Sequence, residues 1–539
     1  MSLGKQFLRL IWLGAALLPA GRSEVLVRWT TTELPPAHTL GVTELVIPWN
    51  GDGKKLLEAA RKQGYRVYVE TRSGSLVAVA EAVSKENVAG LILKIQPAER
   101  ATATETLEKV RERYPKLPVL IVDNRGKQPD MKGWLVFKKD GILQVSSPTS
   151  QPWLDSNLAL VRFERSFEGT HAPIYTFLWD LSDPLEQKLG PGREDYSLAV
   201  AEAGAFHADL ILEIPENQQK ALAGGDAQML KNWAQVKTYL EFCERGRSGS
   251  ASEIPARVGV VTDDYDLSYE ALNLMARHNI AFRVLSASRA AKPGAFEAFD
   301  IALVFSKADR ELTKSLAAFA ARGGIAVLVD QRGDFPWHNS PPAKTNTHSV
   351  SYDVEKGRVI ELGEPVGDPE TFAQDIRRLM VKQRIPVSLW NSLTTLVAAY
   401  PGEKADEIVV ELVNYAEEPL GVQVQVKGNF DSARFESPER GCCEILKPSH
   451  VDGFTEFVVP DLVIGGRVHL SAGAKSSSSD RSGPTGTGAV YNSPLCHGPW
   501  AARNHLSLDT WKQASESGVS VFSRRRGRAA LRGKDLSED

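Results

Sequence analysis

Between residues 25 and 244, eight short apolar runs alternate with charge-rich segments of helical period. The runs cover residues 25–29, 44–49, 66–70, 90–95, 118–123, 158–163, 174–179 and 209–214. The main helical segments cover residues 54–63, 76–87, 104–114, 194–207 and 227–243. Such alternation is typical of βα units around a parallel sheet, whose strands are buried on both faces and therefore read as unbroken apolar runs. The pattern predicts the α/β fold class, with an irregular (β/α)8 barrel over residues 24–246.

The stretch after the fifth run departs from this alternation. Residues 134–146 carry no helical period, and Asp140 and Gly141 near their centre are typical of a hairpin turn. If this hairpin supplies a barrel strand, the run at 25–29 becomes an extra strand and the count shifts by one. Both counts are compatible with the sequence.

Three further regions follow the barrel. In residues 253–345, strand-like runs alternate with helices at 268–278 and 309–322, which predicts a flavodoxin-like α/β domain. Residues 346–385 read as a hairpin and a helix that connect to residues 386–471, where alternating apolar and polar side chains predict a small antiparallel β-sandwich. Residues 472–539 are rich in Gly, Ser and Arg and have little periodicity, so we expect a disordered tail.

Residues 1–23 have the features of a secretory signal peptide. Lys5 and Arg9 precede an apolar run at 10–20, and the small residues Gly21 and Ser23 follow it. The run is too short for a transmembrane helix, which needs roughly 20 apolar residues. We therefore expect an exported protein, periplasmic or extracellular, with no stable membrane anchor.

Composition and motifs limit the partners. A formal net charge of −3 gives the chain no long-range attraction to phosphate backbones, so nucleic acid is not an expected partner. The sequence contains no Walker loop, HExxH motif or EF-hand loop, and its four cysteines have no zinc-ligand spacing. Neither a metal nor a cofactor is predicted.

The order of these regions resembles a known family. Residues 257–286 read RVGVVTDDYDLSYEALNLMARHNIAFRVLS, and residues 300–330 read DIALVFSKADRELTKSLAAFAARGGIAVLVD. Following a barrel and preceding a β-sandwich, they are similar to the middle domain of β-galactosidases, which mediates trimerisation and is itself similar to class I glutamine amidotransferases. The resemblance implies a glycosidase-like protein with carbohydrate as its partner and a homo-oligomer contact through the middle domain. An amidotransferase needs a cysteine nucleophile, and no cysteine lies between Cys243 and Cys442, so this domain is predicted to be inert as an enzyme.

The barrel departs from that family where the chemistry would lie. The resemblance places the general acid in an Asn-Glu pair at the end of the fourth strand and a nucleophilic Glu at the end of the seventh. This sequence has no Asn-Glu dipeptide, and its seventh run ends at Trp179 and Asp180. Either other carboxylates act, or the activity has been lost.

Other carboxylates do follow the predicted strands. Glycoside hydrolysis needs two carboxyl groups that flank the scissile bond, and barrel enzymes carry their active groups at the C-terminal ends of strands. The catalytic candidates are Asp123, Glu164, Asp180 and Glu213. The first two would lie on strands four and six if the hairpin is a barrel strand, and the last two lie on strands seven and eight otherwise. The alternative is that these acids cap helices or form ion pairs with Arg28, Lys94, Arg162 and Arg165.

Four further residues near strand ends are candidates for substrate binding: Glu70, Trp29, Trp49 and Trp179. An indole face stacks well on the apolar face of a pyranose ring. Packing in the core or at the barrel rim is the alternative role for each tryptophan.

Two functions are compatible with these observations. In the first, the chain is an exported O-glycosyl hydrolase that uses the strand-end carboxylates. In the second, it is an inactive relative of such enzymes that binds glycan or serves as an assembly scaffold. The missing Asn-Glu pair favours the second, and the several strand-end acids keep the first open.

Overall fold

The computed structural model describes residues 25–50, 53–123, 135–136, 138–139, 142–143, 153–154, 156–166, 173–177, 179, 190–246, 253–416 and 418–472. The expected signal peptide, the expected tail from residue 473 onward and Asp180 lie outside these residues. None of the described helices is both long enough and apolar enough to cross a membrane.

Seven parallel strands form the N-terminal sheet, in the order β10-β11-β1-β2-β3-β4-β5. Their bounds are β1 Val25–Arg28, β2 Glu44–Pro48, β3 Arg66–Arg72, β4 Gly90–Ile95, β5 Val119–Asp123, β10 Ile174–Phe177 and β11 Asp209–Glu213. The outer strands β5 and β10 approach each other without pairing, so the sheet is nearly closed. This near-complete barrel, followed by two further β-containing units, confirms the predicted fold class.

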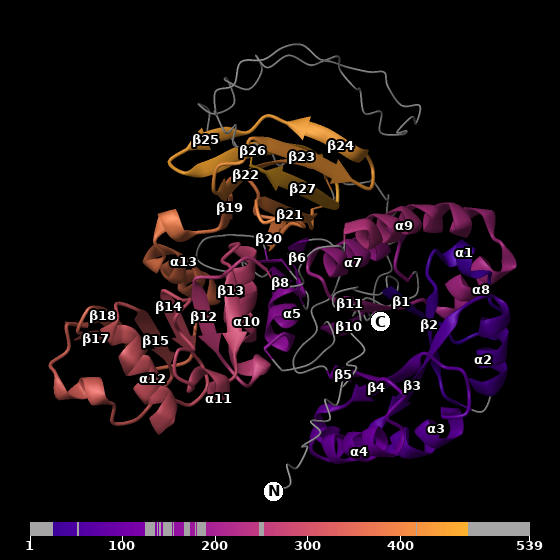
Figure 1. Cartoon of the computed structure of the whole chain (residues 1–539), viewed down its shortest axis with the longest axis horizontal. Helices are drawn as coiled ribbons and strands as arrows, with labels where there is room; N and C mark the ends of the chain where they lie inside the picture. The colour runs from indigo at the N-terminus through magenta and orange to yellow at the C-terminus, as the bar shows by residue number, and fades with distance from the viewer. Residues whose placement is uncertain are drawn as a thin grey trace, which may run out of the picture. The chain divides into compact units, whose positions relative to one another are not determined.

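Helices connect most of these strands. They are α1 Ala37–Leu40, α2 Gly53–Lys62, α3 Leu76–Val83, α4 Arg100–Arg113, α7 Arg193–Ala205, α8 Glu216–Gly224 and α9 Ala227–Arg245. In Figure 1, α2, α3 and α4 lie along one side of the strands that they connect. Helix α2 shows why: its leucines and alanine at the inner positions are buried, while its lysines at 54 and 55 are exposed.

The predicted hairpin at 134–146 is present, but it is not part of the barrel. Strands β7 (Lys138–Lys139) and β8 (Ile142–Leu143) pair antiparallel in a two-stranded sheet of their own. A second small sheet joins β6 (Leu135–Val136) to β9 (Trp153–Leu154). Because β1 pairs with both β11 and β2, the count that made residues 25–29 an extra strand is wrong.

The apolar run at 158–163 was expected to be a strand and is instead a helix, α5 (Leu158–Glu164). Residues 158–163 are all buried, so the run has no polar face that would reveal a helical period. A short run with one polar residue, Arg162, cannot be assigned from periodicity alone. The leucine and alanine content favours the helix.

Helix α7 is buried along most of its length. It packs against α9 and β11 and also contacts β21 (Glu407–Asn414) and β27 (Gly465–Ser471) of the C-terminal β-sandwich. All residues from Tyr196 to Ala205 are buried, which explains why this helix has no polar stripe.

The middle unit is a doubly wound sheet, as predicted. Its parallel strands β12 (Val258–Val261), β13 (Phe282–Leu285), β14 (Ile301–Val304) and β15 (Ile325–Val329) are joined by β18 (Gly357–Leu362) in the order β13-β12-β14-β15-β18. This is the flavodoxin-like order. Strands β17 (Ser349–Val354) and β16 (Lys344–Thr345) extend the sheet antiparallel, and β16 forms its outer edge. The helices are α10 Tyr265–Arg277, α11 Ala287–Ala290, α12 Arg310–Ala321 and α13 Pro369–Leu379.

The C-terminal unit is an antiparallel β-sandwich. One sheet has the order β19-β22-β26-β25 and the other the order β20-β21-β27-β23-β24. The remaining bounds are β19 Val387–Leu389, β20 Thr395–Pro401, β22 Leu420–Lys427, β23 Ser432–Ser437, β24 Gly441–Leu446, β25 Ser449–Val451 and β26 Phe454–Leu462. Alternate residues of β22 are buried in the sandwich core, as the alternating pattern predicts.

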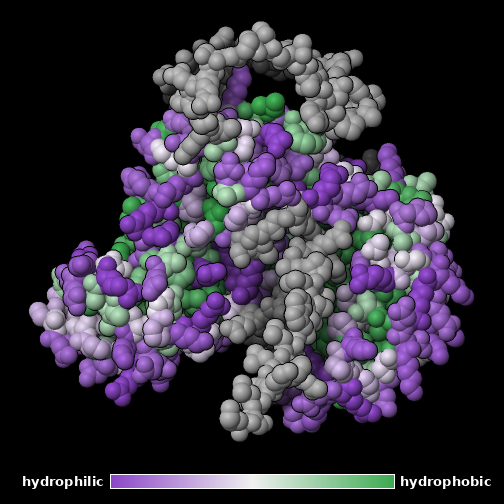
Figure 2. All heavy atoms as spheres, viewed as in Figure 1, coloured by the Kyte–Doolittle hydropathy of each residue, from purple (hydrophilic) through white to green (hydrophobic). Residues whose placement is uncertain are grey.

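One apolar cluster runs through the barrel and into both later units. It includes Val27 and Leu212 of the barrel, Val260 of the middle unit, and Tyr400 and Tyr415 of the sandwich. The visible surface in Figure 2 is mainly hydrophilic, with hydrophobic side chains in small patches.

Candidate functional site at the barrel mouth

Four charged side chains meet at the C-terminal ends of the barrel strands. Arg28 ends β1, Glu70 lies near the end of β3, Lys94 lies near the end of β4, and Glu213 ends β11. Because the strands are parallel and β1 pairs Arg28 with Glu213, these side chains emerge at the same end of the sheet. The active groups of barrel enzymes lie at this end.

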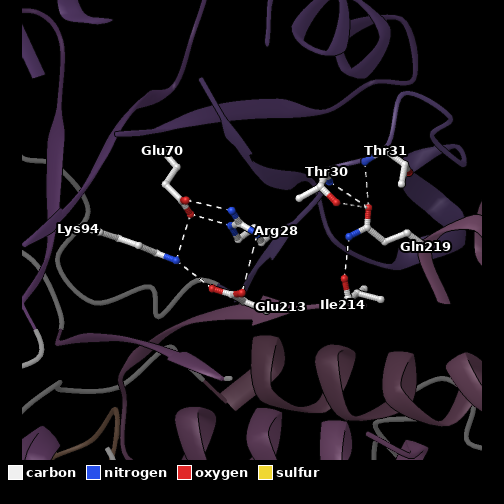
Figure 3. Close-up of polar contacts among 8 residues, drawn as sticks. All are labelled: Arg28, Thr30, Thr31, Glu70, Lys94, Glu213, Ile214 and Gln219. Atoms are coloured by element: carbon white, nitrogen blue, oxygen red, sulfur yellow. Dashed lines mark hydrogen bonds and ion pairs between the residues drawn. The ribbon is translucent and has the colours of Figure 1, made fainter. Parts of the chain in front are cut away.

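The four side chains form a closed ring of ion pairs (Figure 3). Arg28 Nε lies 2.8 Å from Glu70 Oε2, and its Nη2 donates to Glu70 Oε1 at 3.1 Å. Lys94 Nζ lies 3.1 Å from Glu70 Oε2 and 2.8 Å from Glu213 Oε1. Arg28 Nη1 closes the ring at 3.8 Å from Glu213 Oε2. Each charge therefore contacts two charges of the opposite sign.

The ring keeps Glu70 ionised. Burial alone would raise the pKa of Glu70, but the hydrogen bond from Arg28 and the charges of Lys94 and Arg28 outweigh it and lower that pKa below its usual value. Burial likewise opposes the charge of Arg28, and the hydrogen bond and charge of Glu70 more than offset it, so the pKa of Arg28 is raised. Glu70 is therefore a poor general acid, because that role requires a proton at neutral pH.

The ring also holds two carboxylates close together. One ammonium group contacts Glu70 at 3.1 Å and Glu213 at 2.8 Å, so the two contacted oxygens are at most about 6 Å apart. Retaining glycosidases place their two carboxyl groups roughly 5–5.5 Å apart. This upper bound is compatible with a retaining mechanism, in which an ionised Glu70 suits the nucleophile and not the general acid.

A buried glutamine fixes the loop beside the ring. Gln219 Oε1 accepts hydrogen bonds from the backbone N–H groups of Thr30 at 2.9 Å and Thr31 at 3.1 Å. Its Nε2 donates to the carbonyl of Ile214 at 2.6 Å (Figure 3). The residues that follow β1 and β11 are thus tied to each other next to Arg28 and Glu213. No sequence motif pointed to Gln219.

Of the four catalytic candidates, the described structure places only Glu213 at the ring. Glu164 ends helix α5 rather than a strand; together with burial and the nearby Tyr269, its charge raises the pKa of Tyr265. Asp123 is the last residue of β5, and its side chain lies outside the described part of the chain, as does the whole of Asp180. Each predicted pair thus includes a side chain that lies outside the described residues.

The binding candidates are placed differently from one another. Glu70 belongs to the ring. Trp29 is fully buried and its indole N–H donates to the carbonyl of Glu33 at 3.0 Å, so it has no exposed face for a sugar. Trp49 and Trp179 are half-buried and pack against the core.

The ion-pairing alternative describes two of the acids, Glu70 and Glu213. Arg28 and Lys94 pair with Glu70 and Glu213. Two other predicted partners, Arg162 and Arg165, bind Glu253, with Arg162 Nη2 2.7 Å from its Oε2.

Comparisons with known proteins show the fold. No protein-family model matches the sequence, and no curated protein matches it. Among solved structures, the chain is similar to α-L-fucosidase isoenzyme 2 from Paenibacillus thiaminolyticus, with TM-score 0.55 and 12% identity over 84% of this chain and 100% of that one. It is also similar to a β-galactosidase from Bacillus circulans sp. alkalophilus, with TM-score 0.54 and 8% identity over 84% and 99% of the two chains. For Gan42B, a GH42 β-galactosidase from G. stearothermophilus, the TM-score is 0.51 and the identity 10% over 84% and 100%.

These similarities extend over nearly the whole length of each of those chains and agree with the resemblance seen in the sequence. The chain has the architecture of barrel glycosidases such as the GH42 β-galactosidases: a nearly closed parallel barrel followed by β-containing units.

Proposed function

We propose that this chain is a carbohydrate-binding protein built on a glycosidase scaffold, and that its barrel mouth binds a glycan without hydrolysing it. The closed ring of Arg28, Glu70, Lys94 and Glu213 carries the proposal. It pairs Glu70 and Glu213 with two cations each, which weakens both carboxylates as nucleophiles, and it disfavours the protonated form of Glu70 that a general acid needs.

The same ring suits sugar hydroxyls. Its side chains remain between 14% and 26% exposed, so their outer atoms are open to a ligand. A sugar presents neighbouring hydroxyl groups that both donate and accept hydrogen bonds. Guanidinium and ammonium groups only donate, and carboxylates only accept, so adjacent ring members can bind a vicinal diol in opposite directions.

Hydrolysis is the second candidate, because Glu70 and Glu213 are close enough for a retaining mechanism. We further propose export, on the basis of the N-terminal Lys5, Arg9 and the apolar run at 10–20. Glycan binding and export can be tested in separate experiments.

The test combines turnover and binding on the full chain. A panel of nitrophenyl glycosides is expected to show no turnover above the uncatalysed rate, while neutral oligosaccharides bind in calorimetry. Glu213→Gln removes a ring acceptor and is expected to weaken binding about tenfold, as the loss of one charge-assisted hydrogen bond does. Glu216→Gln, on an exposed surface of α8, is the control. Turnover abolished by Glu213→Gln would instead establish the hydrolase.

A further inference from the structure

We propose a second carbohydrate-binding site on the outer face of the β-sandwich sheet β19-β22-β26-β25, with the Trp390 indole as its stacking platform. The inference goes beyond the proposed function, because it concerns a different unit of the fold and rests on none of the residues at the barrel mouth.

Strand register places three side chains in one row across this face. Leu389 pairs with Val424, and Val424 pairs with Phe457; all three belong to or pack against the sandwich core, so they point inward. The next position along each strand points outward. At that position, the backbone N–H of Trp390 donates to the Gln423 carbonyl at 3.1 Å, and Gln423 pairs with Val458.

The tryptophan is exposed and its loop is fixed. Trp390 is 64% exposed. The neighbouring Asn391 is bound at both ends of its amide: Nδ2 donates to the Gly421 carbonyl at 2.8 Å, and Oδ1 accepts from the Gln423 N–H at 2.8 Å. A ligand that stacks on this indole therefore does not have to order the loop, which lowers the entropic cost of binding.

An open groove of about 440 Å³ begins at the same row. Gln423 and Val458 line it together with Ile445, Lys447 and Glu456. Ile445 is 79% exposed and Val458 is 57% exposed, so apolar contacts are available beside the polar groups. Gln425 Nε2 donates to Glu456 Oε1 at 2.8 Å, which orients that carboxylate on the outer face.

The charges of the groove match a neutral sugar chain. Glu444 and Glu456 lie beside a single cation, Lys447, and Arg440 already binds Glu444 at 2.7 Å. This lining has no excess of positive charge for an anionic polymer. It offers donors and acceptors for hydroxyl groups, together with apolar surface at Ile445 and Val458. The Trp390 indole is not part of this lining; it belongs to the row that includes Gln423 and Val458, and it offers a face for the C–H side of a pyranose ring.

Binding of neutral hexasaccharides to the full chain tests the site. The probes are galactan, xylan, mannan and cellulose hexasaccharides, measured by calorimetry. Trp390→Ala is expected to weaken binding of at least one probe about tenfold. Leu267→Ala, which truncates a 68% exposed side chain on α10, is the control and should bind as the unmodified chain does. Circular dichroism confirms that both variants are folded.

The outcomes separate this site from the barrel mouth. Lys94→Met, which alters the ring, should leave the Trp390-dependent binding in place. The proposal would be overturned if Trp390→Ala bound every probe as tightly as the unmodified chain does. It would also be overturned if none of the four probes bound to the unmodified chain. A third outcome would also overturn it: the unmodified chain binds no sugar but self-associates, and Trp390→Ala abolishes the self-association. The face would then be a contact between copies of the chain.

Discussion

At the scale of single residues, the barrel mouth couples four charges so closely that a change to one of them affects its two partners. Each member of the ring has two partners of opposite sign and less than a third of its side chain exposed. Partial burial strengthens such pairs relative to surface ion pairs, and it also makes an unpaired member costly. The ring is therefore both the candidate binding surface and a contributor to the stability of the barrel end.

Glu70 should give the barrel an acid-dependent stability. Its folded-state pKa is lowered, so the stabilisation from its pairs is fully present above the unfolded pKa of about 4.3 and is lost as the pH falls through the folded pKa. Glu70→Gln should lower the free energy of unfolding by about 1–3 kcal/mol at pH 7. That deficit should shrink steadily in urea titrations repeated toward pH 3. A deficit that does not vary with pH would contradict the prediction.

At the scale of elements, α5 shows how a misassigned segment connects two units. Arg162 on α5 is 4% exposed, and it binds both carboxylate oxygens of Glu253 while donating to the carbonyl of Ile280 at 3.1 Å. Burial would raise the pKa of Glu253, but Arg162 and Arg165 outweigh it and lower that pKa, so the pair is ionic. The helix thus joins the barrel to the start of the middle unit.

Removing this acid should be costly. Glu253→Gln leaves the buried Arg162 guanidinium without a counter-charge, and we expect a loss of about 3–5 kcal/mol in the free energy of unfolding. Glu194→Gln removes half of the exposed pair with Arg193 and should cost at most about 0.5 kcal/mol. Chemical denaturation of both variants measures the contrast. Equal effects would show that the Arg162 pair adds no special stability.

Sequence periodicity predicted most elements, and it failed where a run did not divide into an apolar and a polar face. Helices such as α2 and α12 were predicted within a few residues, because their apolar and charged positions alternate with helical period. The run at 158–163 is apolar at nearly every position, so strand and helix look alike. Among the site residues, the strand-end positions of Glu70 and Glu213 were visible in the sequence. Their shared bonds to Lys94 were not, because pairing across strands depends on register.

At the scale of the molecule, the apolar cluster and buried polar contacts join units that the sequence divides. Glu202 on α7 accepts from Asn157 Nδ2 at 2.7 Å and from Tyr175 at 3.1 Å, and the Tyr415 hydroxyl of the sandwich also donates to it. Burial raises the pKa of Glu202 despite these bonds. Tyr400 adds a hydrogen bond to the carbonyl of Ala205 at 3.0 Å.

The barrel and the sandwich should therefore unfold together. Scanning calorimetry of the full chain is expected to show one main transition for both, because separating them exposes the shared cluster and leaves Glu202 with unmet hydrogen bonds. Tyr415→Phe should lower the temperature of that transition, whereas Tyr352→Phe on the β17–β18 hairpin should change it little. Two well-separated transitions in the unmodified protein would refute the coupling.

The outer edge of the middle sheet has a consequence for how the protein behaves in concentrated solution. Strand β16 is only two residues long, Lys344–Thr345, and both are exposed. An open sheet edge can template the addition of a strand from another molecule, and short edges with lysine resist this because few backbone groups are available and the charge must be desolvated. This end of the sheet is therefore protected against edge-to-edge aggregation, although it remains open to water.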